Sequence, residues 1–380
     1  MIEITIICVI LTCCYLLLIA AYRKGWAMQK EFRLPVSFEP TTFISVIIPA
    51  RNEEENIGAC IDAILAQKYH HQLFEIIVVD DHSNDGTAHI VKSYNDSRVR
   101  CLPLAEFFGP GQKINSYKKA ALAAGISKSG GELIVTTDAD CVAPNAWLRH
   151  IACIYEQQDP SLIIAPVIYN STSGLLPIFQ LIDFMGMQGV TAAAHSLKLG
   201  NMSNGANLAF SRAVFERVKG YEGIDELASG DDYLLMMKIA KLPGAIITYL
   251  KSRHAIVSTS PQPGWGSFLQ QRIRWASKSG KYNDWKLTLI LLLVYFFNVS
   301  FVVLAVMGFS HRIYWFTGGI MLLAKTVAEY QFMLPVSAFF HKRWTRVYFP
   351  FLQPMHILYI VLAGFLGVVG KYKWKDRKVK

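Results

Sequence analysis

The feature that most constrains this chain is a long apolar run near its start, residues 2–22 (IEITIICVILTCCYLLLIAAY). A helix needs roughly 20 apolar residues to cross a bilayer, and this run has that length. A cleavable signal peptide would begin with basic residues, but here Glu3 precedes the apolar run, and Arg23 and Lys24 follow it. This order predicts an uncleaved transmembrane anchor over residues 1–24, with the chain after it in the cytoplasm.

Apolar residues are concentrated again near the other end, in residues 285–371. Three stretches stand out there: 287–309, 313–340 and 347–370. Lys325 and Glu329 interrupt the second stretch four residues apart, so we expect them to pair on one face of a helix. Pro350 and Pro354 predict that the first part of the third stretch is kinked or lies at the membrane interface.

The number of C-terminal spans stays open between two and three. Three full spans would put the basic tail, residues 372–380, outside the cell, whereas its positive charges favour the inside. A re-entrant or interfacial segment would remove this conflict. We therefore predict an integral membrane protein with its catalytic domain in the cytoplasm.

Composition narrows the class of partner. The chain is 52% hydrophobic and 17% charged, with a net charge of +10. Basic residues beside apolar spans are explained by anionic membrane lipids, so we expect membrane lipids and no nucleic acid as partners. The seven cysteines show no metal-ligand spacing, and they are expected to be reduced thiols.

Residues 40–282 alternate between short apolar runs and helical patterns. The predicted strands cover 43–50, 74–81, 99–104 and the run that begins at Leu133. This alternation predicts an α/β fold with a mostly parallel sheet and helices on its faces. After the first strand, the glutamates at 53–55 are expected in the first turn of a helix, where they would suit its dipole.

Polar side chains follow three of these strands, at the edge where open α/β sheets bind ligands. Glu53 follows the first strand, Asp80 and Asp81 end the second, and Asp138 and Asp140 follow the fourth. Any one cluster alone could be a cap. Three converging clusters without opposing lysines would repel one another unless a cation or a hydrogen-bonding ligand lies among them. The chain has no GxGxxG and no GxxxxGK[ST] motif, which argues against a dinucleotide or P-loop site.

Six motifs, in order, resemble the family 2 glycosyltransferases of the GT-A (Rossmann-like) fold: VIIPARNEE, VVDDHSNDGT, TTDADC, NGANLAFSR, SGDDYLL and QQRIRW. The resemblance spans residues 43–280. It is closest to membrane-embedded members with a QxxRW motif, namely synthases of the cellulose, hyaluronan and poly-N-acetylglucosamine type, and ceramide glucosyltransferases. It implies a cytoplasmic GT-A domain with transmembrane helices on both sides.

The resemblance also implies roles for particular residues. The nucleotide sugar, expected to be a UDP-sugar, would be bound by Ala50, Asn52, Glu53, Asp80, Asp81, Lys118, Asp138 and Arg274. Asp140, with Asp138, would hold Mg²⁺ or Mn²⁺, and Gln271, Trp275, Asn204 and Asn207 would contact the acceptor. Asp232 would be the catalytic base, with Asp231 in place of the family's glutamate. Ala123 replaces the family's asparagine after Lys118, and an unusual segment, residues 107–117, precedes that lysine.

Chemistry explains why such residues suit this reaction. A divalent cation on hard carboxylate oxygens neutralises the charge that grows on a diphosphate leaving group. Arg274, and also Arg272, offers a bidentate contact to phosphate. One ionised base, Asp232, that activates the acceptor hydroxyl gives a single displacement, and therefore inversion.

Simpler interpretations stay open for several of these residues. Asp231 and Asp232 also suit a helix N-terminus, Trp275 a membrane interface, and residues 204–207 a plain turn. The apolar segment 172–200 is expected either to lie on the membrane or to be a core helix of the domain.

Three functions remain possible at this level. The first is transfer of one sugar to a lipid or lipid-linked acceptor, which the small number of spans favours. The second is processive synthesis of a polysaccharide. The third is a non-catalytic membrane scaffold with a transferase-like domain.

Overall fold

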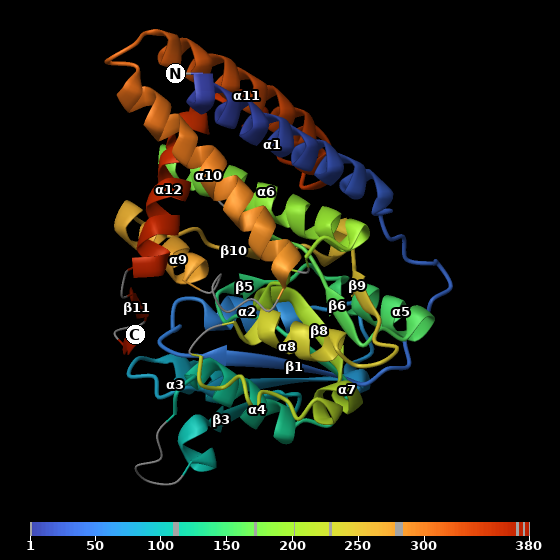
Figure 1. The fold of residues 1–380 in the computed structure, drawn as a ribbon. Helices are drawn as coiled ribbons and strands as arrows, with labels where there is room; N and C mark the ends of the chain where they lie inside the picture. Colours follow the sequence, from blue (N-terminus) through green and yellow to red (C-terminus); the bar gives the residue numbers. More distant parts are fainter. Residues whose placement is uncertain are drawn as a thin grey trace. The chain divides into compact units, whose positions relative to one another are not determined.

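A computed structural model describes residues 2–108, 114–170, 173–200, 202–227, 230–277, 284–369, 372–374 and 377–379 (Figure 1). The chain forms two compact units. One, the sheet unit, comprises residues 30–170 and 202–260, and the other, the apolar unit, comprises residues 1–29, 171–201 and 261–380.

The sheet unit is built on seven strands in the order β3-β2-β1-β4-β8-β6-β9. The four predicted strands run parallel to one another, and β8 runs antiparallel to β4 and β6. Every residue of β4 is buried, as expected of a strand that is covered on both faces. The prediction of a mostly parallel α/β sheet is confirmed. The strands are β1 (Ile44–Ala50), β2 (Phe74–Asp80), β3 (Val99–Pro103), β4 (Leu133–Thr136), β6 (Leu162–Ile164), β8 (Leu208–Ser211) and β9 (Ile247–Tyr249).

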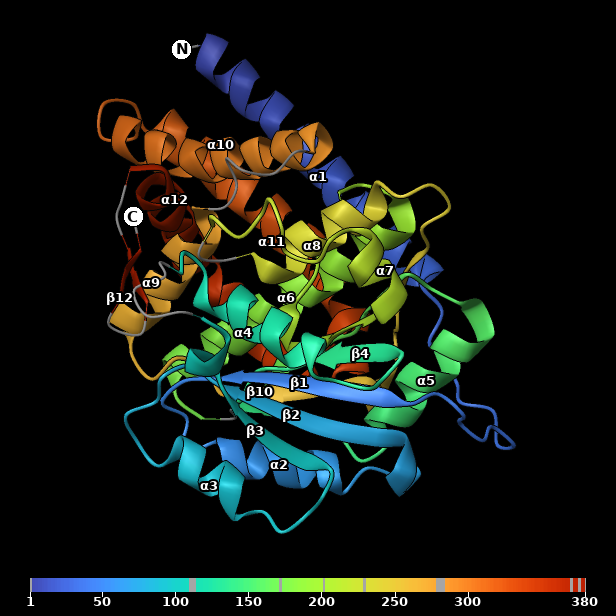
Figure 2. The ribbon, with the colours of Figure 1, turned by 90° about the horizontal axis from the view of Figure 1, so that it is seen from below.

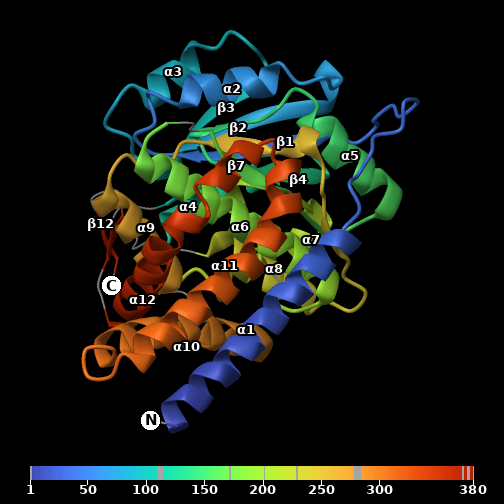
Figure 3. The ribbon, with the colours of Figure 1, turned by 90° about the horizontal axis from the view of Figure 1, so that it is seen from above.

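Helices cover both faces of this sheet. Figures 2 and 3 show α2 and α3 on one side and α4 on the other. Gly125 lets α4 approach closely, because a Cβ there would lie 2.6 Å from Ile47 and 3.0 Å from Val79. The helices of the unit are α2 (Ile57–Leu65), α3 (Thr87–Ser93), α4 (Tyr117–Ser127), α5 (Trp147–Gln158), α7 (Arg212–Arg217) and α8 (Asp231–Ala240).

A second, three-stranded sheet was not predicted. It joins β5 (Cys141–Val142), β10 (Val257–Thr259) and β7 (Val167–Tyr169) in the order β5-β10-β7. Thr259 pairs with Cys141 in its register. The strand β10 therefore brings a residue from far along the chain beside the segment that follows β4.

One local prediction is wrong. The glutamates at 53–55 do not lie in the first turn of α2, which begins at Ile57 and has no acidic residue there. The backbone N–H of Glu53 instead donates to Thr87 Oγ1 at 2.8 Å, and that of Glu54 donates to Asp85 Oδ2 at 3.1 Å. These bonds hold the glutamates in a loop, because tertiary hydrogen bonds outweigh the weak preference for the helix dipole.

The apolar unit consists mainly of long helices: α1 (Ile2–Met28), α6 (Leu175–Leu197), α9 (Trp265–Ala276), α10 (Trp285–Met307), α11 (Ile313–Phe339) and α12 (Gln353–Val369). Within the described part of the chain, four segments are long and apolar enough to cross a membrane: Glu3–Met28, Leu175–Leu197, Trp285–Met307 and Pro350–Val369. Helix α6 belongs to this unit and contacts α1 and α11, so it is not a core helix of the sheet unit.

The two expectations for the C-terminal stretches are met. Lys325 Nζ donates to Glu329 Oε2 at 2.9 Å inside α11. The stretch that begins near residue 347 is not α-helical at first, because a 3₁₀ turn, η7 (Pro350–Leu352), precedes α12. Gln353 Nε2 donates to Glu329 Oε2 at 2.7 Å, so α12 begins beside the interior of α11. Of the basic tail, the structure describes only the backbone of two short paired strands, β11 (Tyr372–Trp374) and β12 (Arg377–Val379).

Candidate functional site

Hydrogen bonds join the loops that follow β1 and β2. Asn52 has a positive φ of 50°, a conformation that asparagine tolerates better than most residues. Its backbone N–H donates to Ser83 Oγ at 3.0 Å, and its side-chain oxygen accepts from the Asn84 N–H at 2.9 Å. The residues expected at the nucleotide, Ala50, Asn52 and Glu53, are therefore held against the loop after β2.

The two aspartates at the end of β2 both contact polar groups of neighbouring residues. Asp81 is buried, and its backbone N–H donates to Ala50 O at 2.8 Å. Its carboxylate lies 3.0 Å from His82 Nδ1. The carboxylate of Asp80 accepts from the Ser83 N–H at 3.4 Å. The β2 loop thus presents two carboxylates in a defined geometry.

Lys118, on α4, links two of the predicted acidic groups. Its Nζ lies 2.6 Å from Asp138 Oδ1 and 3.3 Å from Asp231 Oδ2. Burial lowers the pKa of Lys118, but the Asp138 and Asp231 carboxylates outweigh it and keep this pKa above its ordinary value. The sequence argument assumed carboxylates without an opposing lysine. That assumption is wrong for Asp138, because α4 brings Lys118 between Asp138 and Asp231.

Asp140 has a different environment. Burial, together with the nearby charges of Asp138 and Glu53, raises the pKa of Asp140 from 3.8 to about 6. Its Oδ2 accepts a hydrogen bond from Thr259 Oγ1 at 3.2 Å. Residues that follow β1 and β4 therefore come together at Asp140. The negative charges of Glu53 and Asp138 oppose the ionisation of Asp140.

The donor set suits a divalent cation that shares its coordination with a diphosphate. Among the residues that the structure describes, no group of three or more histidine, cysteine, aspartate or glutamate side chains forms a metal cage. Mg²⁺ is commonly bound by one or two carboxylates together with waters and substrate phosphates. Asp140, whose ionisation is opposed by nearby negative charge, fits that arrangement. Asp138 fits it less well, because one of its oxygens already contacts Lys118.

Asp231 and Asp232 begin α8, after Gly230. Asp232 Oδ2 accepts from the Gly205 N–H at 3.1 Å, and its Oδ1 accepts from the Tyr233 N–H at 2.7 Å. A Cβ at Gly205 would lie 2.9 Å from Asp231 Oδ2, so that carboxylate would have to move. The two aspartates thus have different neighbours: Lys118 contacts Asp231, and a backbone amide contacts Asp232.

The side chains of the two asparagines expected at the acceptor form hydrogen bonds within the protein. Asn204 Oδ1 accepts from the Ala206 N–H at 3.0 Å and caps its own turn. Asn207 is fully buried. Its amide group donates to Pro166 O and Ala255 O, both at 2.8 Å, and accepts from the Trp147 indole at 2.9 Å. We therefore assign Asn207 to holding the turn rather than to an acceptor, because its polar atoms are occupied in the interior.

The remaining predicted residues, Gln271, Arg274 and Trp275, lie on α9 in the apolar unit. Arg272, expected as a second phosphate contact, is buried and lies 2.8 Å from Asp183 Oδ2. The Arg272 guanidinium also lies over the Trp275 ring, 4.2 Å from its centroid. The phosphate role expected for Arg272 is therefore wrong, because a buried carboxylate already neutralises it.

Within the sheet unit the structure brings together the loops after β1 and β4, the turn at Gly205 and the start of α8. One residue of this site, Thr259, was not found from the sequence. It carried no signal, because β10 belongs to neither the main sheet nor any motif.

Metal-free protein with Asp140→Asn is expected to be more stable than the wild type at pH 7.5, by about 1–2 kcal/mol. The pKa of Asp140 is raised to about 6. Between its unfolded value and pH 6 the folded state binds more protons than the unfolded state, so stability falls as the pH rises through this window. The gain should vanish at pH 4. Denaturant unfolding of the full chain in chelator at both pH values measures it.

Asp85→Asn is the matched control for this measurement. Burial raises the pKa of Asp85, but hydrogen bonds from Thr87 outweigh it and lower that pKa overall. Its ionised form therefore stabilises the folded state, and its replacement should destabilise the protein at pH 7.5. An Asp140→Asn protein that is less stable than the wild type at pH 7.5 would contradict the electrostatic account of Asp140.

The fold and site can now be compared with known proteins. A model of Glycosyl transferase family group 2 matches residues 133–367, and a model of Glycosyl transferase family 2 matches residues 45–216. The first of these matches covers more than half of the chain. The chain belongs to the family 2 glycosyltransferases, enzymes that transfer a sugar from a nucleotide sugar.

Three similar proteins illustrate the range of this family. Glycosyltransferase AglE of Haloferax volcanii is 28% identical over 250 residues, 66% of this chain and 76% of AglE. Probable glycosyltransferase YdaM of Bacillus subtilis is 26% identical over 61% of this chain, which spans 54% of YdaM. An undecaprenyl-phosphate 4-deoxy-4-formamido-L-arabinose transferase of Yersinia pestis is 31% identical over 123 residues, 31% of this chain and 35% of that protein.

A solved structure supports the fold over nearly the whole chain. The mannosyltransferase PcManGT of Pyrobaculum calidifontis, solved with GDP-Man and Mn²⁺, has a TM-score of 0.59. The comparison covers 93% of this chain and 99% of PcManGT, at 18% sequence identity. At this identity the likeness establishes the GT-A-type fold, with long apolar helices, and nothing more specific.

Proposed function

We propose that this enzyme moves one sugar from a nucleotide sugar to a lipid or lipid-linked glycan at the cytoplasmic face of a membrane, with inversion. One observation carries the proposal. Lys118 contacts both Asp138 and Asp231, while Asp140 lies beside further negative charge and Asp232 accepts from a backbone amide. Two of the four carboxylates are therefore paired with a lysine. Of the other two, Asp140 is suited to binding a cation and Asp232 to accepting a proton.

The roles follow from this division. Asp140, with Asp138, would hold Mg²⁺ or Mn²⁺, which when bound neutralises charge on the diphosphate of the donor. The loops at Ala50–Glu53 and Asp80–Asp81 would bind the nucleotide, and a UDP-sugar is the donor that the motif resemblance favours. Asp232 would accept the proton of the acceptor hydroxyl, and Gly205 N–H would keep its carboxylate oriented.

Three observations support a lipid acceptor and a cytoplasmic site. The described chain contains four helices long enough to cross a membrane. Arg23 and Lys24 lie near the end of α1, and basic residues at the end of a span favour the cytoplasm. The relative from Yersinia pestis is named as an undecaprenyl-phosphate 4-deoxy-4-formamido-L-arabinose transferase, and undecaprenyl phosphate is a lipid phosphate.

Three residues on α9 remain proposed contacts. Arg274 would contact phosphate, and Gln271 and Trp275 would contact the acceptor.

The test is incorporation of label from radiolabelled nucleotide sugars by membranes that contain the full chain. We expect one donor to label a lipid-extractable product, the label to disappear with chelator, and Mn²⁺ or Mg²⁺ to restore it. Incorporation that ignores the chelator would contradict the metal site. A ladder of polymer would instead establish a processive synthase.

A non-catalytic scaffold is the remaining alternative. It predicts loss of at least one of Asp140, Asp232 and Arg274, and all three are present. Failure of every donor to label any product, with membranes in which the chain is folded, would favour the scaffold.

A further inference from the structure

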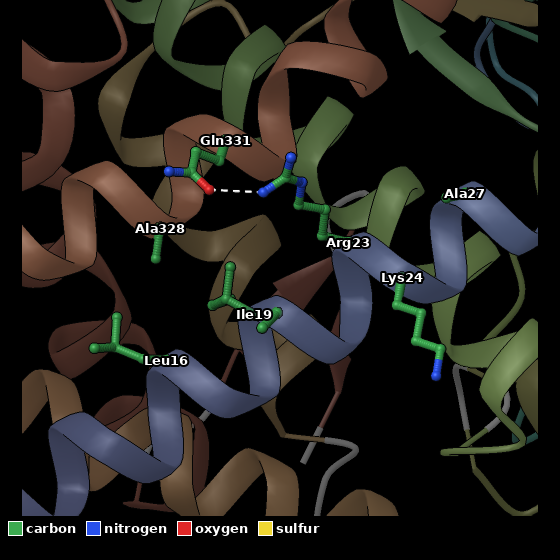
Figure 4. Close-up of a pocket in the computed structure, with 8 residues that line it drawn as sticks. Leu16, Ile19, Arg23, Lys24, Ala27, Ala328 and Gln331 are labelled. Atoms are coloured by element: carbon green, nitrogen blue, oxygen red, sulfur yellow. Dashed lines mark hydrogen bonds between the residues drawn. The ribbon is translucent and has the colours of Figure 1, made fainter.

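A cavity of about 340 Å³ lies between α1 and α11 in the apolar unit. Figure 4 shows that Leu16 and Ala328 line one end of it, while Arg23 and Lys24 lie toward the other. Its size is at the lower end of the range of ligand pockets, about 300–1,000 Å³. The cavity is thus apolar at one end and cationic at the other.

Small side chains create this cavity. Ala20 on α1 and Ala328 on α11 both line it. Ala20 is exposed, and Ala328 is partly exposed, so the cavity opens to the surroundings of the helices. Seven residues separate Leu16 from Arg23, which corresponds to roughly 10 Å along a helix. This length matches the part of a lipid acyl chain that lies nearest the headgroup.

The cationic end has defined chemistry. Arg23 Nη1 donates to Gln331 Oε1 at 2.7 Å, as drawn in Figure 4, so a neighbouring helix orients the guanidinium. Arg23 and Lys24 are both exposed. A guanidinium carries five N–H donors, and it contacts phosphate oxygens in pairs. An oriented arginine beside a lysine is suited to a phosphodiester.

The cationic end is also at the basic end of this helix pair. Helices α1 and α11 run in the same direction, because the Tyr15 hydroxyl bonds to Glu329, while Trp26 and Phe339 lie edge to face with centroids 5.5 Å apart. Basic residues therefore gather where both helices end. They are Arg23 and Lys24 on α1, and Lys342, Arg343 and Arg346 after α11.

The opposite end is different. There Glu3 lies in the first turn of α1, and Arg312 precedes α11. Positive residues collect on the side of a bilayer that carries anionic lipids. In a bilayer with one anionic leaflet, the cationic end of the cavity would therefore lie at the headgroups of that leaflet.

We propose that this cavity binds one anionic phospholipid of the bilayer. Its phosphate would lie at Arg23 and Lys24, and one acyl chain would run along α1 past Ala20 to Leu16, against Ala328. The charge of the headgroup and the length of the apolar part match the two ends of the cavity. This proposal is independent of the transfer reaction.

Native mass spectrometry of the full chain, with dioleoylphosphatidylglycerol or dioleoylphosphatidylcholine, tests the site. We expect one phosphatidylglycerol to be retained in preference to phosphatidylcholine. Arg23→Gln with Lys24→Gln should weaken its retention roughly 10- to 30-fold. Ala20→Leu with Ala328→Leu, which keeps both charges, should weaken it similarly by filling the cavity. Lys342→Gln with Arg343→Gln, at the same end but outside the cavity, is the matched control and should retain the lipid.

Three outcomes would overturn the proposal. The first is retention in both cavity variants equal to that of the wild type. The second is loss only when charge is removed, which would indicate diffuse attraction to a basic surface. The third is a change from dimer to monomer in the leucine variant, which would place a second copy of the chain in the cavity. Circular dichroism and gel filtration establish that each variant is folded.

Discussion

Asp232→Asn is expected to lower the rate of sugar transfer by about 100- to 10,000-fold, the range that a positioned general base contributes. Asparagine has nearly the same shape but cannot take a proton from the acceptor hydroxyl. The carboxylate is held by the N–H groups of Gly205 and Tyr233, so its position is set by the backbone. Nucleotide binding should be unchanged, because in the proposed arrangement Asp232 contacts only the acceptor.

Single-turnover transfer and titration with the free nucleotide separate these two effects. Asp225→Asn is the matched control, since Asp225 is exposed in the segment before α8 and should keep full activity. Unchanged transfer in Asp232→Asn would remove the assignment of the base. Loss of nucleotide binding together with transfer would show that Asp232 belongs to the donor site instead.

Arg272→Met is expected to destabilise the folded protein by about 3–5 kcal/mol, because it removes the arginine paired with a buried carboxylate. The Arg272 and Asp183 side chains are 3% and 2% exposed, and their charged atoms lie 2.8 Å apart. The Tyr359 hydroxyl donates to Asp183 at 2.6 Å. The ion pair thus connects α9, α6 and α12 in surroundings that hold little water.

Unfolding of the purified full chain in detergent, followed by tryptophan fluorescence, measures the change. Arg272→Met with Asp183→Asn should recover much of the loss, since neither charge then remains buried. Arg343→Met, an exposed arginine of the same unit, should change stability by less than about 0.5 kcal/mol. A double variant no more stable than Arg272→Met would show that packing, rather than charge, accounts for the effect.

The fold was largely predictable from local patterns. The strands β1, β2 and β4 are short, largely apolar runs with polar residues at or just after their ends, and burial on both faces demands such an apolar composition. The strands β6, β8 and β9 of the main sheet and the small β5-β10-β7 sheet were missed. These strands are two to four residues long, and pairing over long sequence distances decides them.

The candidate site was predictable in residue type but not in pairing. Asp138, Asp140, Asp231 and Asp232 were found from their motifs. Which of them is neutralised depends on where α4 places Lys118, and a sequence does not contain that distance. The phosphate contact expected of Arg272 was wrong for the same reason, because its partner Asp183 is 89 residues away in the sequence.

The sequence by itself determined the class of this protein: apolar helices at both ends, an α/β sheet between them, and carboxylates at the strand ends. These properties follow from composition and periodicity, which act over a few residues at a time. Only the tertiary structure decided which charged groups are paired and which partners the polar side chains have. It paired Lys118 with Asp138 and Asp231, set Asp140 among negative charges and buried Asn207, because electrostatic and hydrogen-bond energies depend on separations that folding alone creates.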